Sequence, residues 1–74
     1  MYDKVLALLQ GEFPDVDFLS SDALVDEGVL DSLMLTEIIA ALTMEFGVMI
    51  PYEEIIEENF NSVKGMAGMI ERLQ

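Results

Sequence analysis

One segment organises this chain: residues 31–47, with the sequence DSLMLTEIIAALTMEFG. Its apolar residues recur at the spacing of one helix face, namely at Leu35, Ile38, Ile39, Leu42 and Phe46. Gly47 follows directly, where a left-handed residue commonly ends a helix, and Val48 can complete that cap with an apolar contact. We therefore predict a helix from about Ser32 to Phe46, with Ser32 presented at its start.

Apolar stripes on either side predict two further main helices. The first spans about residues 2–13 and ends near Gly11 and Pro14; its stripe is Tyr2, Val5, Leu6, Leu9 and Phe13. Asn61 or Ser62 is expected to cap the last helix, whose stripe is Val63, Met66, Ala67, Ile70 and Leu73. Gly65 and Gly68 inside it cost about 1 kcal/mol each relative to alanine. They either permit a close approach of another segment or loosen the helix.

The remaining segments complete the predicted architecture. Pro51 suits the first position of a short helix over residues 52–58, with Ile55 and Ile56 facing inward. Residues 14–30 show no sustained period, and we expect their apolar side chains to hold a long loop against the core: Val16, Phe18, Leu19, Leu24, Val25, Val29 and Leu30. The prediction is a single all-α domain over residues 1–74, a small bundle of three main helices plus one short helix.

Composition excludes several classes of function. The chain has 74 residues, no cysteine and a net charge of −12. Without cysteine there is neither a disulfide framework nor a thiolate metal site, and no calcium-loop motif is found, so we expect no metal centre. The negative field disfavours nucleic acid and anionic membranes and attracts basic proteins. No segment has transmembrane length or a targeting pattern, and we expect a cytoplasmic monomer.

Ser32 is the residue whose position suggests chemistry. The first turn of a helix has free backbone N–H groups and a positive dipole end, which favour a phosphate ester. The chain has no histidine or cysteine, so no base is evident that would turn this hydroxyl into a nucleophile. Ser32 is therefore better suited to being modified than to performing chemistry, and we do not expect an enzyme. The simpler interpretation is that Asp31 and Ser32 only cap the helix.

A wider pattern bears on this choice. Gly28-Val29-Leu30-Asp31-Ser32-Leu33 before an amphipathic helix resembles the attachment motif of acyl carrier proteins. Residues 45–51 resemble the segment after the second helix of that family, and residues 59–63 resemble the entry to its last helix. Length, acidity and helix order agree as well, so the resemblance covers essentially the whole chain.

The resemblance implies a carrier of acyl or aminoacyl groups. Ser32 would receive a 4′-phosphopantetheine arm from coenzyme A through a separate phosphopantetheinyl transferase, and the arm would hold its cargo as a thioester. Asp31 would position the hydroxyl or act only as a helix cap. Leu33 would contact the arm and partner enzymes, or else lie in the core. The implied partners are the transferase, a loading enzyme and downstream synthases or transferases.

The helix that follows Ser32 departs from the fatty-acid-synthesis carriers, whose partner-facing side is rich in acidic residues. Here only Glu37 is clearly acidic on that side, beside Met34 and Met44. We predict partner contacts at Leu33, Met34, Glu37, Met44, Glu53 and Glu54. The pattern favours a polyketide, nonribosomal peptide or aminoacyl pathway over primary fatty acid synthesis.

Two alternatives stay open at this point. Each of Met34, Met44 and Met49, taken singly, is expected to fill a gap in the core. The whole chain could also be an unmodified acidic adaptor that binds a basic protein.

For the carrier, we expect a dry core that sequesters a short polar cargo weakly or not at all.

Overall fold

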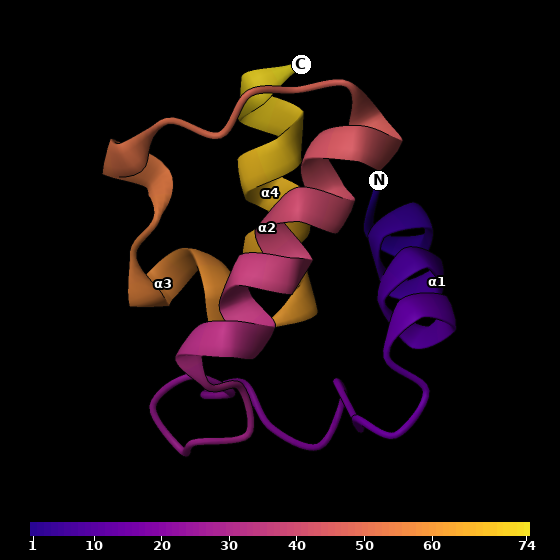
Figure 1. The fold of residues 1–74 in the computed structure, drawn as a ribbon, viewed down its shortest axis with the longest axis vertical. Coiled ribbons are helices and arrows are strands. Elements are labelled where there is room, and N and C mark those ends of the chain that lie inside the picture. The colour runs from indigo at the N-terminus through magenta and orange to yellow at the C-terminus, as the bar shows by residue number, and fades with distance from the viewer.

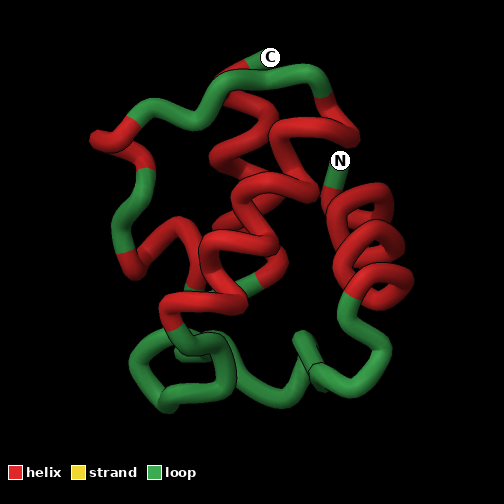
Figure 2. Tube along the Cα trace, in the orientation of Figure 1, coloured by secondary structure: helices red, strands yellow, loops and turns green.

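The computed structural model describes all residues 1–74 and contains helices and loops but no strands (Figures 1 and 2). Its elements, in chain order, are α1 (Tyr2–Glu12), α2 (Ser32–Phe46), the 3₁₀ turn η1 (Tyr52–Glu54), α3 (Glu57–Phe60) and α4 (Val63–Leu73). Helix α4 contacts both α1 and α3, and α1 contacts α2. The predicted fold class, a small all-α bundle of three main helices with a long first loop, is confirmed. No helix has the length and apolar character needed to cross a bilayer.

Local signals set both ends of α2. The Oδ1 atom of Asp31 accepts a hydrogen bond from the Met34 N–H at 2.8 Å, which is an N-cap. At the other end Gly47 has φ of 63°, and its N–H donates to the Thr43 carbonyl at 3.0 Å. Val48 is buried directly after it. The predicted bounds of this helix are confirmed.

One apolar core joins the helices and the first loop. Val5 and Leu9 of α1 and Ile38 and Leu42 of α2 are fully buried. From α4 and the residues before it, the core receives Phe60, Val63, Met66, Ala67, Met69 and Ile70. Fourteen buried residues make a single cluster, which gives this small chain the efficient core that its size demands.

The loop between α1 and α2, at the bottom of Figures 1 and 2, is held by three buried side chains: Phe18, Leu24 and Leu30. The ring of Phe18 also packs edge-on against Phe13, with 6.3 Å between centroids. Val16 and Val25 are half-buried against the core, whereas Leu19 and Val29 are exposed, contrary to expectation. The loop is therefore pinned mainly at positions 18, 24 and 30, and position 30 directly precedes the start of α2.

The prediction of one short helix over residues 52–58 is wrong. The chain forms η1, breaks, and forms α3, and Ile55 and Ile56 are exposed at the break. Asn59 explains the break, because its Nδ2 donates to the Glu54 carbonyl at 2.7 Å. The same carbonyl oxygen also accepts a hydrogen bond from the Ile56 N–H. A continuous α-helix makes neither of these two bonds.

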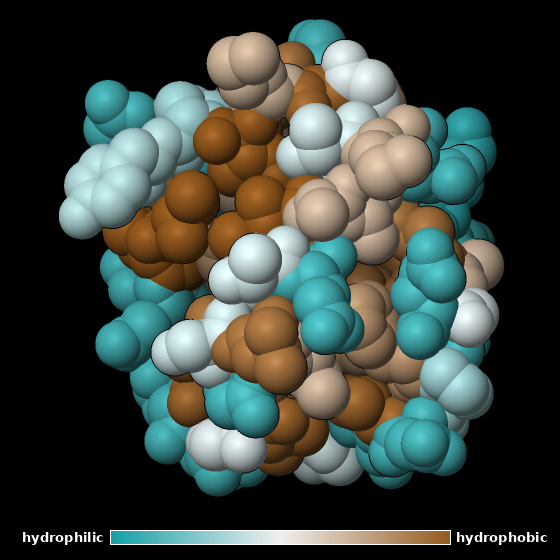
Figure 3. All heavy atoms as spheres, in the orientation of Figure 1, coloured by the Kyte–Doolittle hydropathy of each residue, from teal (hydrophilic) through white to brown (hydrophobic).

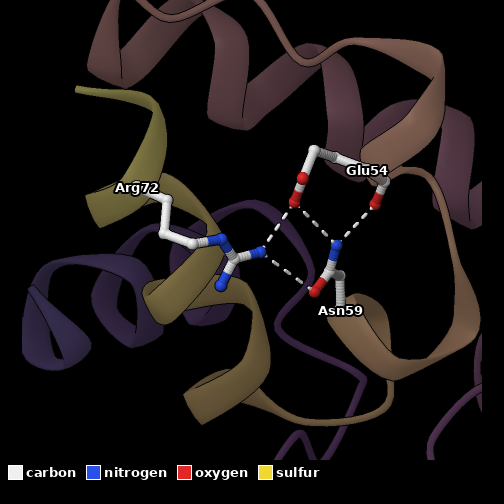
Figure 4. Close-up of polar contacts among 3 residues, drawn as sticks. All are labelled: Glu54, Asn59 and Arg72. Atoms are coloured by element: carbon white, nitrogen blue, oxygen red, sulfur yellow. Dashed lines mark hydrogen bonds and ion pairs between the residues drawn. The ribbon is translucent and has the colours of Figure 1, made fainter.

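A polar network fixes η1 to α4 (Figure 4). The Glu54 carboxylate accepts from Asn59 Nδ2 at 3.1 Å and pairs with Arg72 Nη2 at 2.6 Å. Asn59 is buried, and its Oδ1 lies 3.4 Å from the same Arg72 nitrogen. Three residues from separate elements thus satisfy each other's hydrogen-bonding groups. A buried amide such as that of Asn59 requires such partners.

Candidate functional site

Ser32 is the first residue of α2 and its side chain is exposed. Asp31, just outside the helix, provides the N-cap, so the Ser32 hydroxyl is not occupied by that role. Helix α2 is 15 residues long, and the unpaired N–H groups of its first turn face the same end of the helix. The predicted site residue therefore stands accessible at a helix N-terminus.

This arrangement suits a covalent phosphodiester. Negative charge is favoured at the amino end of a helix, because the backbone dipoles sum to a partial positive charge there. No cluster of histidine, cysteine and acidic side chains able to hold a metal ion is present. The chain has no imidazole or thiol to activate the hydroxyl. The exposed hydroxyl can therefore receive a covalent group.

The exposed side of α2 is more apolar than acidic. Leu33 is 70% exposed and Met44 is 84% exposed, with the exposed Glu37 between them in sequence. Figure 3 shows apolar side chains among polar ones on the face of the molecule that α2 occupies. Because Leu33 is so exposed, it is not a core residue. Met34, by contrast, packs partly against the core.

The expectation that the methionines fill core gaps is wrong for two of three, because Met44 and Met49 are 84% and 85% exposed. Of the three glutamates predicted to contact partners, Glu37 and Glu53 are exposed, whereas Glu54 is engaged with Asn59 and Arg72. The partner roles of all six predicted residues stay predictions.

Two hollows border α2. The first, of about 200 Å³, lies between α2 and the segment around α3, and we name it the α2–α3 pocket; its lining is Val25, Leu35, Ile55, Ile56, Glu57 and Phe60. The second, of about 340 Å³, is lined by Glu12, Phe13, Glu37, Ala40, Ala41 and Met44, and we name it the α1–α2 groove. The exposed isoleucines at the η1–α3 break are thus walls of the α2–α3 pocket.

A pair of carboxylates lies between the first loop and α3. The pKa of Glu57 is raised above its ordinary value of 4.5, first by a side-chain hydrogen bond with Asp26 and then by repulsion from the same carboxylate. Slight desolvation and the charge of Glu58 act in the same direction. The contact with Asp26 therefore makes ionisation of Glu57 less favourable than it is for an isolated glutamate side chain.

Sequence reasoning missed the contact of Asn61 with the first loop. Asn61 or Ser62 was expected to cap the last helix, and the structure assigns that cap to Ser62, whose Oγ accepts from the Gly65 N–H at 2.9 Å. Asn61 Oδ1 instead accepts from the backbone N–H groups of Val25 and Asp26. These partners are 36 and 35 positions away in the sequence, so no local sequence pattern predicts these hydrogen bonds.

Comparison with known proteins agrees with this geometry. The family model described as "Phosphopantetheine attachment site" matches residues 3–70. Three D-alanyl carrier proteins of Streptococcus pyogenes, from serotypes M1, M5 (strain Manfredo) and M49 (strain NZ131), are each 35% identical over 60 residues, covering 81% of this chain and 76% of each relative. No solved structure gave a significant match. An exposed serine at the start of a capped helix fits the serine-linked group of this family, and the chain belongs to the phosphopantetheine-binding carrier proteins.

Proposed function

We propose that Ser32 is the residue that receives the 4′-phosphopantetheine arm, and that the protein carries acyl or aminoacyl groups between partner enzymes. The observation that supports this most strongly is the exposed Ser32 at the N-terminus of α2, with the capping role taken by Asp31. When attached, the arm supplies the terminal thiol that holds the cargo as a thioester. The chain has no thiol of its own.

The residues around Ser32 have separable roles in this proposal. Asp31 holds the first turn of α2 through its bond to the Met34 N–H, so the serine is presented in one backbone geometry. The free N–H groups of that turn stabilise the phosphate of the arm. Leu33, 70% exposed beside the serine, offers an apolar contact to the arm and to partner enzymes.

The cargo that we propose is small, and an aminoacyl group fits best. The matched relatives are named D-alanyl carrier proteins, which supports an aminoacyl cargo. The α2–α3 pocket holds only about 200 Å³, which is below the range of about 300–1,000 Å³ for ligand pockets, and the core beside it is a single cluster of buried side chains. A polyketide or nonribosomal peptide pathway is the next candidate, ahead of primary fatty acid synthesis.

Partner enzymes are proposed to dock on the exposed side of α2 through Leu33, Glu37 and Met44. A flexible, exposed methionine adapts to apolar surfaces, and Glu37 is the charged group between the two apolar ones. Glu37→Lys should therefore weaken binding to the loading enzyme while changing the melting temperature little, because its side chain is exposed. Unchanged affinity, measured by titration calorimetry, would contradict this docking assignment.

The attachment is tested by intact mass after incubation with coenzyme A, magnesium and a broad-specificity phosphopantetheinyl transferase. The wild-type protein should gain the mass of one phosphopantetheine, and Ser32→Ala should gain none. Ser20→Ala is the matched control, since Ser20 is also exposed but lies in the first loop, and it should load normally. Loading of Ser32→Ala would show that another residue is modified. An unchanged mass of the wild-type protein would favour the acidic adaptor.

A further inference from the structure

Asn61, at the junction of α3 and α4, binds the turn of the first loop that precedes Ser32. Its Oδ1 accepts hydrogen bonds from the N–H groups of Val25 at 2.9 Å and Asp26 at 3.1 Å. Its backbone carbonyl accepts from the Leu24 N–H at 2.9 Å. Three consecutive amides of the loop therefore end on a single residue of a distant segment.

These amides have no partners within their own turn. Residues 24–28 form one tight turn, in which Glu27 N–H donates to the Ala23 carbonyl and Gly28 N–H donates to the Val25 carbonyl. The first N–H groups of such a turn are left unpaired by its geometry. Asn61 thus acts as an N-cap that is supplied from another part of the chain.

The amide group of Asn61 also suits its charged surroundings. Its Nδ2 donates to Asp26 Oδ2 at 3.2 Å, and the Asp26 carboxylate is the group that raises the pKa of Glu57. A neutral donor at position 61 stabilises the Asp26 carboxylate, whereas an aspartate would add another negative charge to a pair that already repels. Asparagine combines the acceptor that the amides need with the donor that Asp26 needs.

The turn is linked to Ser32 through Leu24 and Leu30. Leu24 and Leu30 are both buried, and Leu30 N–H donates to the Leu24 carbonyl at 3.1 Å. Asp31 and Ser32 follow Leu30 directly, so a shift of the turn is passed to the start of α2. We propose that Asn61 is a positioning residue for the modification of Ser32, holding residues 24–30 as the platform that the phosphopantetheinyl transferase recognises. This inference rests on the proposed attachment at Ser32.

The test compares steady-state loading of wild-type protein and Asn61→Ala, under conditions where circular dichroism shows both to be folded. Without Asn61 the turn should sample other conformations before binding, so the transferase KM for the carrier should rise. The rise is about tenfold if the ordered turn is populated about 10% of the time. In the same variant the amide protons of Val25 and Asp26 should exchange faster, while that of Met34, bonded to Asp31, should keep its protection.

Asn59→Ala is the matched control. It removes the same kind of side chain two positions earlier, and the bonds that it deletes go to Glu54 and Arg72 and not to the turn. It should lower the melting temperature and leave the KM for loading at the wild-type value. An equal rise in KM for Asn59→Ala would show that general destabilisation slows loading, and would overturn the positioning role.

An exchange of two residues tests the contact itself. Asn61→Asp should raise KM, because it places a carboxylate against Asp26 and removes the donor. Adding Asp26→Asn restores one donor, one acceptor and the original net charge, so the double variant should recover most of the wild-type KM. This holds as a test even if Asn61→Ala fails to fold, and no recovery would refute the inference.

The two proposals fail separately. A wild-type protein that gains no phosphopantetheine, or a Ser32→Ala variant that gains it, overturns the attachment site. Normal loading of wild-type protein on Ser32, together with an unchanged KM for folded Asn61→Ala, overturns only the positioning role of Asn61.

Discussion

Gly65 lies where α4 passes the end of α3, and we predict that Gly65→Ala destabilises the protein. A Cβ atom at this position would lie 2.8 Å from the Glu58 carbonyl oxygen and 3.3 Å from the Asn59 carbonyl oxygen. These are backbone atoms, which cannot rotate away. Alanine gains about 1 kcal/mol of helix propensity over glycine, but overpacking of a tight contact costs about 1–3 kcal/mol. The expected net effect is a loss on the order of 1 kcal/mol.

Gly68 offers a matched control three residues further along the same helix. A Cβ atom there would meet only the Arg72 Nη1 atom, at an ordinary 3.8 Å. Gly68→Ala should therefore realise most of the propensity gain and stabilise the protein by about 1 kcal/mol. For a domain of this size each kcal/mol shifts the melting temperature by about 4–8 °C.

Thermal melts followed by far-ultraviolet circular dichroism should move the two variants in opposite directions from the wild-type protein. Urea unfolding of the same proteins gives the free energies, and unchanged m-values confirm that stability alone has changed. A Gly65→Ala variant that melts above wild type, as Gly68→Ala should, would refute the argument that backbone contact requires glycine at position 65.

Three further predictions concern the site and the charge of the protein. Asp31→Ala should lose about 1 kcal/mol of stability with its cap, whereas Ser32→Ala should change it by less than about 0.5 kcal/mol; equal losses in urea unfolding would contradict the assignment of the cap to Asp31. Because the folded pKa of Glu57 lies above 4.5, the stability from its proton is complete below pH 4.5 and is lost as pH rises through the folded pKa. Glu57→Gln should thus raise the melting temperature at pH 7 and bring no such gain at pH 4, and equal melting curves at pH 7 would show that Asp26 does not oppose Glu57. Added salt should raise the melting temperature, since a net charge of −12 opposes the compact state, and a flat dependence on ionic strength would argue against that repulsion.

The sequence alone determined the elements whose signals are local. The bounds of α2 followed from its apolar period and from Gly47, because a helix end is set by residues within one turn of it. The position of Ser32 at the start of that helix followed from the same signals. The choice of cap between Asp31 and Ser32 needed the structure, although both residues are local to it.

Tertiary structure alone decided the features that depend on contacts between separate elements. Local pattern favoured a helix across Ile55 and Ile56, but Asn59 takes the Glu54 carbonyl and the chain breaks there. The glycines of α4 are equivalent in sequence, and only the path of α3 makes Gly65 a point of close approach. Asn61 had the sequence of a helix cap and serves a turn more than thirty positions away. Periodicity and caps report interactions within a few residues along the chain, whereas these three depend on which backbone atoms folding brings alongside.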